Sequence, residues 1–177
     1  MTRQEAVDKA VKYFEEGYAC SQSVLLAFAE ELKLDPRVAK LISGTFGGGM
    51  GRLRNKCGAL TGSFMVLGLA QGYEDPKDMD GKMEAYKKVR ELNKRLEDEY
   101  GTSNCNELLI KYSKPENVQA RSHHKDICWR LVASAAGNVC PSISKNPAAA
   151  SNDCFITARS PLCFASIALS YSFLKFS

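Results

Sequence analysis

The sequence predicts an all-α protein, a compact bundle of about five to seven helices with a glycine-rich loop. Apolar residues recur every three or four positions in most segments, a spacing that places one face of a helix against a core. Start and stop residues bracket these segments, and no stretch alternates with a period of two for long enough to predict a strand. The length of 177 residues fits a single domain.

The first two helices are bounded by recognisable start and stop residues. Thr2 and Glu5 have the spacing of a capping box, in which each side chain accepts a hydrogen bond from the other residue's backbone N–H. Gly17 is expected to end this helix, because glycine readily adopts the left-handed conformation found there. A second helix is predicted from near Cys20 until the Leu34-Asp35-Pro36 sequence ends it.

A short helix and a loop come next. Asp35 as N-cap and Pro36 at the first helical position predict a helix through Ile42. Residues 44–51 (GTFGGGMG) include five glycines in eight positions and are expected to form a loop. Its backbone amides could surround whatever Cys57 faces, and the alternative is a flexible surface loop. It lacks the GxxxxGK[ST] order, so nucleotide binding is not expected.

A fourth helix is predicted over about residues 57–71, with Gly72 as its stop. Gly58 and Gly62 lie inside it, although glycine in a helix costs about 1 kcal/mol relative to alanine. Two such glycines indicate the close approach of another backbone or of a bound group.

The longest helix is predicted over residues 78–100, and Gly101 ends it. A short helix over residues 105–112, capped by Asn104, and a last one from near Asp126 complete the bundle. The longest helix carries an apolar stripe that we assign to the core or to a partner-helix surface: Met79, Met83, Tyr86, Val89, Leu92, Leu96 and Tyr100.

Composition excludes several classes of function. The 24 Lys and Arg are interspersed with 20 Asp and Glu, for a net charge of +4, so no nucleic-acid partner is expected. The longest uncharged runs have 17 and 15 residues, fewer than the roughly 20 that span a bilayer. Residues 1–16 contain no apolar signal segment. We therefore expect a cytoplasmic protein with no membrane span.

The composition changes after Cys140. Residues 141–177 contain four charged residues in 37 positions, whereas the first 140 residues contain the other 40. We therefore divide the chain into a four-cysteine helical domain, residues 1–140, and an atypical Ser- and Ala-rich tail, residues 141–177. An out-of-frame reading of the end of the gene would explain the loss of charge.

Cysteine is the residue type that indicates function. The chain has seven, and an odd number cannot all pair within one molecule. Free backbone N–H groups and the helix dipole at a helix start favour a thiolate over a thiol. For Cys57, the basic residues 52–56 add positive charge. Four cysteines lie in or just before the first turn of a predicted helix: Cys20, Cys57, Cys105 and Cys128.

Thiolates that converge at one end of a bundle have three chemical uses. They can hold an iron–sulfur cluster, hold a structural zinc, or form a dithiol that cycles to a disulfide. The intervals of 37, 48 and 23 residues, without a Cys-x-x-Cys pair, argue against zinc ribbons, thioredoxin-like motifs and haem attachment. They leave the cluster and the disulfide open. For any single cysteine, the alternative is a buried residue that only fills space.

The order of these motifs resembles the C_GCAxxG_C_C family of redox-active proteins. The resemblance covers about residues 4–137 and rests on Tyr18-Ala19-Cys20, the glycine loop, Cys57-Gly58-Ala59-Leu60-Thr61-Gly62, Cys105 and Cys128. It implies that the four helix-start cysteines are the family cysteines. It also implies a cysteine-dependent redox protein, encoded near transporter genes in many members. Relatives fused to ferredoxins and to split-Soret cytochromes imply electron transfer and iron–sulfur ligation.

The chain departs from the family pattern in two places. No Cys-x-x-Cys-His occurs, so the haem part of the cytochrome relatives is absent. Three cysteines have no counterpart in the family pattern: Cys140, Cys154 and Cys163.

Our leading hypothesis is an iron–sulfur cluster that serves electron transfer or redox sensing with a redox protein partner. One alternative is a thiol–disulfide redox protein that uses two of the same cysteines, with Cys57 as a low-pKa nucleophile. The other is a non-catalytic accessory protein that binds a transporter component, and a homodimer is also considered. No catalytic residue is assigned. The expected metal ligands are Cys20, Cys57, Cys105 and Cys128, and the expected cofactor-binding glycines are Gly47, Gly48, Gly49, Gly58 and Gly62.

Overall fold

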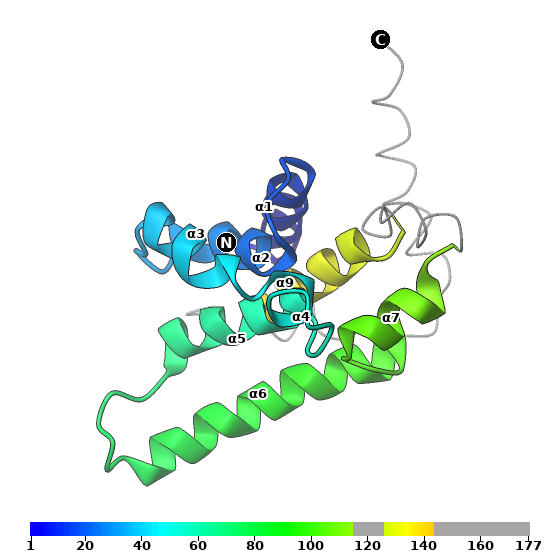
Figure 1. The fold of residues 1–177 in the computed structure, drawn as a ribbon. Coiled ribbons are helices and arrows are strands. Elements are labelled where there is room, and N and C mark those ends of the chain that lie inside the picture. The colour runs from blue at the N-terminus through cyan, green and yellow to red at the C-terminus, as the bar shows by residue number, and fades with distance from the viewer. Residues whose placement is uncertain (115–125, 144–177) are drawn as a thin grey trace.

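The computed structural model describes residues 1–114 and 126–143, and within them the chain is an all-α bundle of seven helices and one further turn, α4 (Figure 1). No strand occurs in these residues, so the predicted fold class is confirmed. The elements are α1 (Arg3–Glu15), α2 (Cys20–Ala29), α3 (Pro36–Gly44), α4 (Gly47–Met50), α5 (Gly58–Gln71), α6 (Met79–Tyr100), α7 (Cys105–Tyr112) and α9 (Cys128–Ile143).

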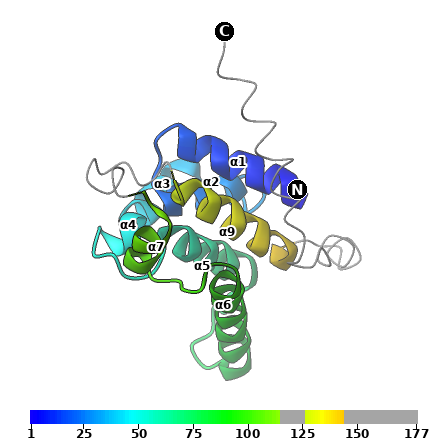
Figure 2. The same cartoon turned by 90° about the vertical axis from the view of Figure 1, so that its right-hand side faces the viewer.

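Two apolar helices, α2 and α5, form the centre of the bundle. They pack against each other, α1 packs on α2 and α9, and α5 packs on α9 (Figure 2). Most residues of α2 and α5 are buried, because both helices are apolar around most of their circumference. The largest fully buried side chains include Phe28, Leu25, Leu60, Leu67 and Leu96.

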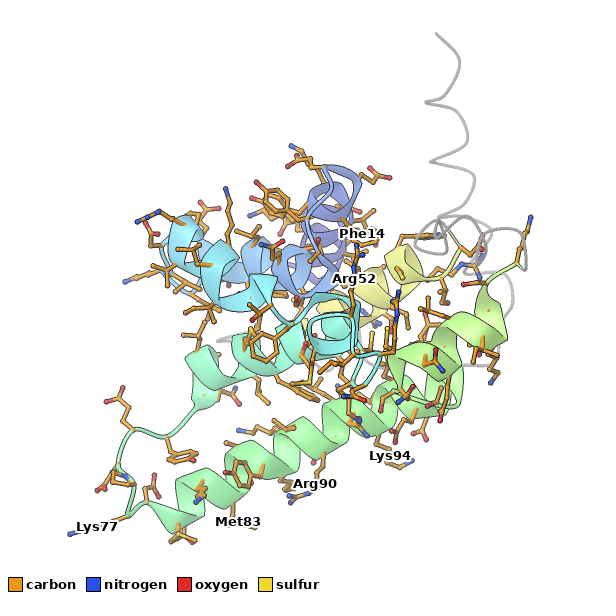
Figure 3. All side chains as sticks on the ribbon, viewed as in Figure 1. Phe14, Arg52, Lys77, Met83, Arg90 and Lys94 are labelled. Carbon is orange, nitrogen blue, oxygen red and sulfur yellow. The ribbon has the colours of Figure 1, made fainter. Side chains whose placement is uncertain are left out.

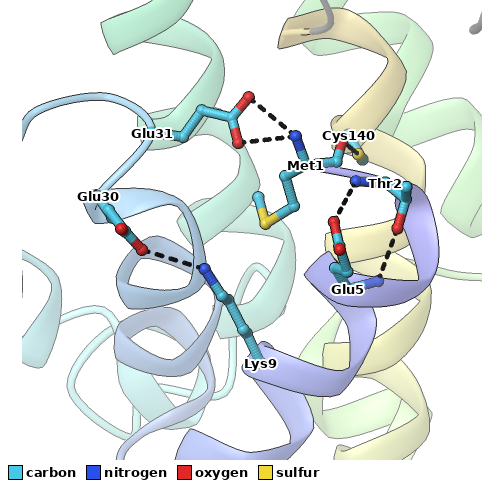
Figure 4. A network of polar contacts seen from close by, with 7 residues as sticks. All are labelled: Met1, Thr2, Glu5, Lys9, Glu30, Glu31 and Cys140. Carbon is cyan, nitrogen blue, oxygen red and sulfur yellow. Dashed lines mark hydrogen bonds and ion pairs between the residues drawn. The ribbon is translucent and has the colours of Figure 1, made fainter.

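The caps that the sequence predicted are present. Thr2 Oγ1 accepts from Glu5 N at 3.2 Å and Glu5 Oε2 accepts from Thr2 N at 2.7 Å, which completes the capping box (Figure 4). Asp35 Oδ1 accepts from Val38 N at 2.9 Å at the start of α3. Asn104 caps α7 in the same way. Each side chain satisfies an N–H that the first turn of a helix leaves free.

The apolar stripe of α6 is buried only toward its C-terminal end. Leu92, Leu96 and Tyr100 are buried, whereas Met79, Met83 and Tyr86 are 55%, 49% and 44% exposed. Figures 1 and 2 both show the N-terminal half of α6 extending beyond the other helices. The stripe is therefore core in one half and surface in the other.

The last helix crosses the composition break. α9 continues through the buried residues Val139 and Cys140 and ends at Ile143, after Pro141. The expected tail beyond it, with Cys154 and Cys163, lies outside the described residues. Among the described helices, none has the length and apolar character needed to cross a membrane.

Candidate functional site

Four helix starts meet at one pocket. Cys20, Cys105 and Cys128 are the first residues of α2, α7 and α9, and Cys57 is the N-cap of α5. The structure thus brings together the four cysteines that the sequence analysis grouped, although they are distant along the chain. The pocket is lined by Cys20, Gly48, Gly49, Arg54, Cys57, Gly58, Cys105, Leu108, Leu109, Cys128 and Leu131.

The pocket is small and mostly apolar. Its volume is about 30 Å³, far below the roughly 300–1,000 Å³ of sites for organic ligands. Among the described residues, no three Cys, His, Asp or Glu side chains are positioned to hold a metal ion. The size of the cavity therefore suits a small inorganic group or direct chemistry between thiols.

Cys57 and Cys105 are held side by side by a short antiparallel backbone pairing. Residues 54–57 and 103–106 run past each other, with an isolated bridge between Lys56 and Asn104. The pairing therefore fixes the two cysteines relative to each other, although 47 residues separate them along the chain. Three backbone hydrogen bonds make the junction: Cys57 N to Ser103 O at 2.9 Å, Cys105 N to Asn55 O at 2.6 Å, and Asn106 N to Arg54 O at 3.2 Å.

A polar network ties this junction to α6. Lys56 Nζ donates to Asn93 Oδ1 at 3.0 Å and to Ser103 Oγ at 2.7 Å. Ser103 Oγ donates to Glu97 Oε1 at 2.6 Å. The hydrogen bonds from Ser103 and Asn93, with the nearby Lys56 charge, lower the pKa of Glu97. Lys56 is thus a structural cation rather than an activator of Cys57.

Three of the predicted glycines line the pocket. Gly48 and Gly49 have φ angles of 64° and 74°, which glycine adopts without the steric cost that a Cβ brings. A Cβ on Gly49 would lie 2.6 Å from Cys105 Cβ, and one on Gly58 would lie 2.9 Å from Phe46 O. These glycines let the loop approach the cysteines closely. The loop that the sequence predicted contains one irregular turn, α4.

The other two predicted glycines are packed beside the pocket and do not line it. A Cβ on Gly47 would lie 2.7 Å from Ala19 Cβ, and one on Gly62 would lie 2.7 Å from Ser21 O. Both contacts are with the residues on either side of Cys20. Gly47 and Gly62 therefore set the position of the α2 start against the loop and against α5.

Burial dominates the ionisation of the thiols. It raises the pKa of Cys57 to about 12, although the backbone N–H groups of Leu60 and Ala59 oppose the shift. The expectation of a low-pKa nucleophile at Cys57 is wrong, because desolvation in the apolar pocket outweighs the effect of the helix start. The basic residues also act elsewhere than expected, since Arg54 Nη1 donates to Cys105 Sγ at 3.9 Å.

Cys20 is the thiol that interacts with the other three. A hydrogen bond with Cys128, followed by burial, raises the pKa of Cys20 well above its ordinary value. Charge on Cys20 also raises the pKa values of Cys57 and Cys105. Cys20 and Cys128, the first residues of α2 and α9, are thus a hydrogen-bonded thiol pair.

Sequence reasoning missed two contributors to the site. Arg54 was assigned to Cys57 as part of a basic stretch, and Ser103 was not singled out at all. Both act through the pairing of residues 54–57 with residues 103–106, a non-local contact that leaves no periodic or motif signal.

Comparison with known proteins identifies the family. A family model described as "Putative redox-active protein (C_GCAxxG_C_C)" matches residues 18–140, a span that contains all four pocket cysteines. A search of curated proteins and a search of solved structures each found no match. With its four cysteines gathered at one pocket and most of its length matched, the chain belongs to the C_GCAxxG_C_C family of redox-active proteins.

Proposed function

We propose that the four pocket cysteines bind an iron–sulfur cluster, through which the protein passes or senses single electrons. The observation that carries the proposal is the convergence of four thiols, from four helix starts, on one small apolar pocket. Four cysteine thiolates in a site shielded from water are the usual ligand set of such clusters. We place this chemistry in the cytoplasm, where thiols remain reduced.

The residues around the thiols fit a cluster in their chemistry. Leu108, Leu109 and Leu131 limit access of water, and Arg54 supplies positive charge beside Cys105. When bound, the cluster would supply reversible one-electron exchange. Because no three potential ligand side chains in residues 1–114 and 126–143 are positioned to hold a single ion, loading would require the cysteines to move closer to the group.

Loading also requires the thiols to lose protons. In the free protein, burial keeps Cys57 and Cys105 protonated, since it raises both pKa values. Ligand thiols are deprotonated when they bind a metal, so metal binding releases protons. Cluster assembly should therefore be more favourable at pH 8 to 9 than at pH 6, at about equal iron and sulfide supply.

Anaerobic purification followed by absorbance spectroscopy and iron and sulfide analysis tests the proposal. We expect a coloured protein that loses its iron when Cys20, Cys57, Cys105 or Cys128 is replaced by serine. Cys140→Ser is the matched control, because Cys140 is also a buried cysteine but lies about 18 Å further along α9 from Cys128. Its thiol donates to Met1 O instead (Figure 4). Colourless, iron-free wild-type protein would contradict the proposal.

A second candidate is a dithiol formed by Cys20 and Cys128, favoured by the hydrogen bond between these two thiols. Oxidation would join the two sulfurs and release two protons, with two electrons passing to an oxidised partner such as a protein disulfide. Peptide mapping of oxidised protein would then find this disulfide, and Cys57→Ser would leave it intact. A cross-link elsewhere, or none, would argue against the pair.

A further inference from the structure

The loop that closes one side of the pocket also presents apolar and basic side chains to solvent. Leu53 is 72% exposed and Met50 is 38% exposed, and Arg52 between them is exposed as well. Arg54, the next cation, lines the pocket itself. We call these four residues the rim: Met50, Arg52, Leu53 and Arg54.

The positive charge of the chain is concentrated in the segment that contains the rim. Residues 36–73 include five Lys and Arg and no Asp or Glu, whereas the rest of the chain has 19 cationic and 20 acidic side chains. The adjoining helix α2 has no charged residue. Glu107, near the start of α7, is engaged with Thr102. The rim is therefore an exposed part of a segment that has a net positive charge.

The backbone of the rim is held in an unusual conformation. Met50, Arg52 and Arg54 have φ angles of 67°, 65° and 62°, each of which costs a non-glycine residue about 1 kcal/mol or more. Hydrogen bonds from Leu53 N to Met50 O and from Asn55 N to Gly49 O, both 3.1 Å, fix the loop. A constrained loop thus exposes Met50, Arg52 and Leu53, while Arg54 reaches into the pocket beside Cys105.

We propose that the rim is the docking surface for a small acidic electron-carrier protein. Carboxylates of the carrier would pair with Arg52 and Arg54, and its apolar contacts would cover Met50 and Leu53. The proposal rests on the redox function above, because docking here would bring the carrier beside the cysteine pocket. The rim is small, as in transient electron-transfer complexes, and charge complementarity would chiefly speed and orient the encounter.

A protein partner fits the rim better than a nucleic acid does. A protein surface that binds nucleic acid carries many Lys and Arg side chains, which follow the phosphate backbone. The rim has only two cations, Arg52 and Arg54. The exposed apolar side chain of Leu53 lies between them in the sequence, and that of Met50 precedes them. That mixture matches the polar edge and apolar centre of a protein interface.

Titration calorimetry with flavodoxin, a small acidic flavoprotein, as the probe tests the proposal directly. We expect the full chain to bind it at low ionic strength and to lose about tenfold in affinity when salt rises to about 0.2 M. Arg52→Glu and Leu53→Asp should each weaken binding about tenfold or more. Cytochrome c, a basic carrier of similar size, should not bind.

Two matched variants control for nonspecific effects. Arg90→Glu reverses an exposed arginine that points away from the bundle on α6 (Figure 3). Leu69→Asp changes a leucine that is 52% exposed near the C-terminal end of α5, about 18 Å from Cys57 along the helix. Both should bind flavodoxin like the wild type.

Three results would overturn the docking proposal. They are no flavodoxin binding at low salt, equal weakening by the control variants, and tighter Arg52-dependent binding of duplex DNA or of anionic vesicles. Reduction of the same protein by dithionite, followed by its absorbance, tests the redox centre separately. Binding without a reducible centre would contradict the cluster, and a reducible centre without binding would contradict only the rim.

Discussion

At the residue scale, Arg54 and the surrounding apolar side chains act on Cys105 in opposite directions. Burial raises the pKa of the Cys105 thiol, and the Arg54 guanidinium lowers it by stabilising the thiolate. The net shift is upward. Arg54 therefore offsets part of the cost of ionising a thiol in an apolar pocket.

Replacing Arg54 should slow the reaction of Cys105 with alkylating reagents. Without the guanidinium, the Cys105 pKa rises further and the thiolate fraction at pH 8 falls, and the thiolate is the species that reacts. Arg54→Gln should thus lower the iodoacetamide labelling rate of Cys105, measured peptide by peptide by mass spectrometry. Arg54→Lys keeps the charge at the same positive-φ position and should retain most of the rate. Equal rates in the two variants would show that the charge of Arg54 does not matter.

Gly62 and Gly68 offer a matched test of packing within α5. A Cβ at Gly62 would lie 2.7 Å from Ser21 O and 3.1 Å from Val24 Cβ, whereas a Cβ at Gly68 has nothing within 4 Å. Gly62→Ala should lower the free energy of unfolding by about 1–3 kcal/mol, because α2 and α5 must separate. Gly68→Ala should raise it by up to about 1 kcal/mol through helix propensity. Urea unfolding checks both, and a stabilised Gly62→Ala would contradict the close approach.

At the element scale, the helices were predictable because their signals are local. Each N-cap side chain accepts a hydrogen bond from the backbone N–H three residues further along the chain. This holds for Thr2, Asp35 and Asn104. Gly101 ends α6 with a φ of 85°, as the sequence indicated. Capping and periodicity operate within a few residues, so one sequence suffices to show them.

What the sequence could not show is which surfaces meet. The stripe on α6 has a uniform period, yet only its C-terminal part packs against the bundle. The four cysteines could be grouped by their helix starts. The partnership of Arg54 with Cys105, however, depends on a backbone pairing between segments about 50 residues apart. Burial at the pocket likewise reversed the expected ionisation of Cys57.

The side chain of Ser103 links the two segments of that pairing to each other and to α6. It is 2% exposed, and its hydroxyl lies between Lys56 and Glu97. Ser103→Ala should lower the free energy of unfolding by about 1–3 kcal/mol, because it removes hydrogen bonds to two charged side chains, Lys56 and Glu97. Chemical denaturation measures the change.

Ser113→Ala is the matched control for this substitution. Ser113 Oγ is buried without a hydrogen-bond partner in the part of the chain that the structure describes. Its removal should therefore be nearly neutral or slightly stabilising. Similar losses in Ser103→Ala and Ser113→Ala would show that the hydrogen bonds of Ser103 contribute little.

At the scale of the whole molecule, the thiol pocket exists only in the folded bundle. Its cysteines come from α2, α5, α7 and α9, so no single segment can form it. In the unfolded chain each thiol is solvated and ionises at its ordinary pKa. The ionisation of the pocket is therefore linked to global stability.

The reduced, metal-free protein should lose stability as the pH rises above about 9. Cys57 has a pKa of about 12 in the folded protein against an ordinary value of 9.0, and Cys20 and Cys105 are shifted in the same direction. Between these values the unfolded chain releases thiol protons that the folded chain retains. The free energy of unfolding should then fall by up to about 1.4 kcal/mol per pH unit for each such proton. Urea unfolding at pH 8, 9 and 10 measures the slope. Cys57→Ala should make it shallower, and identical slopes in the two proteins would mean that Cys57 ionises normally in the folded state.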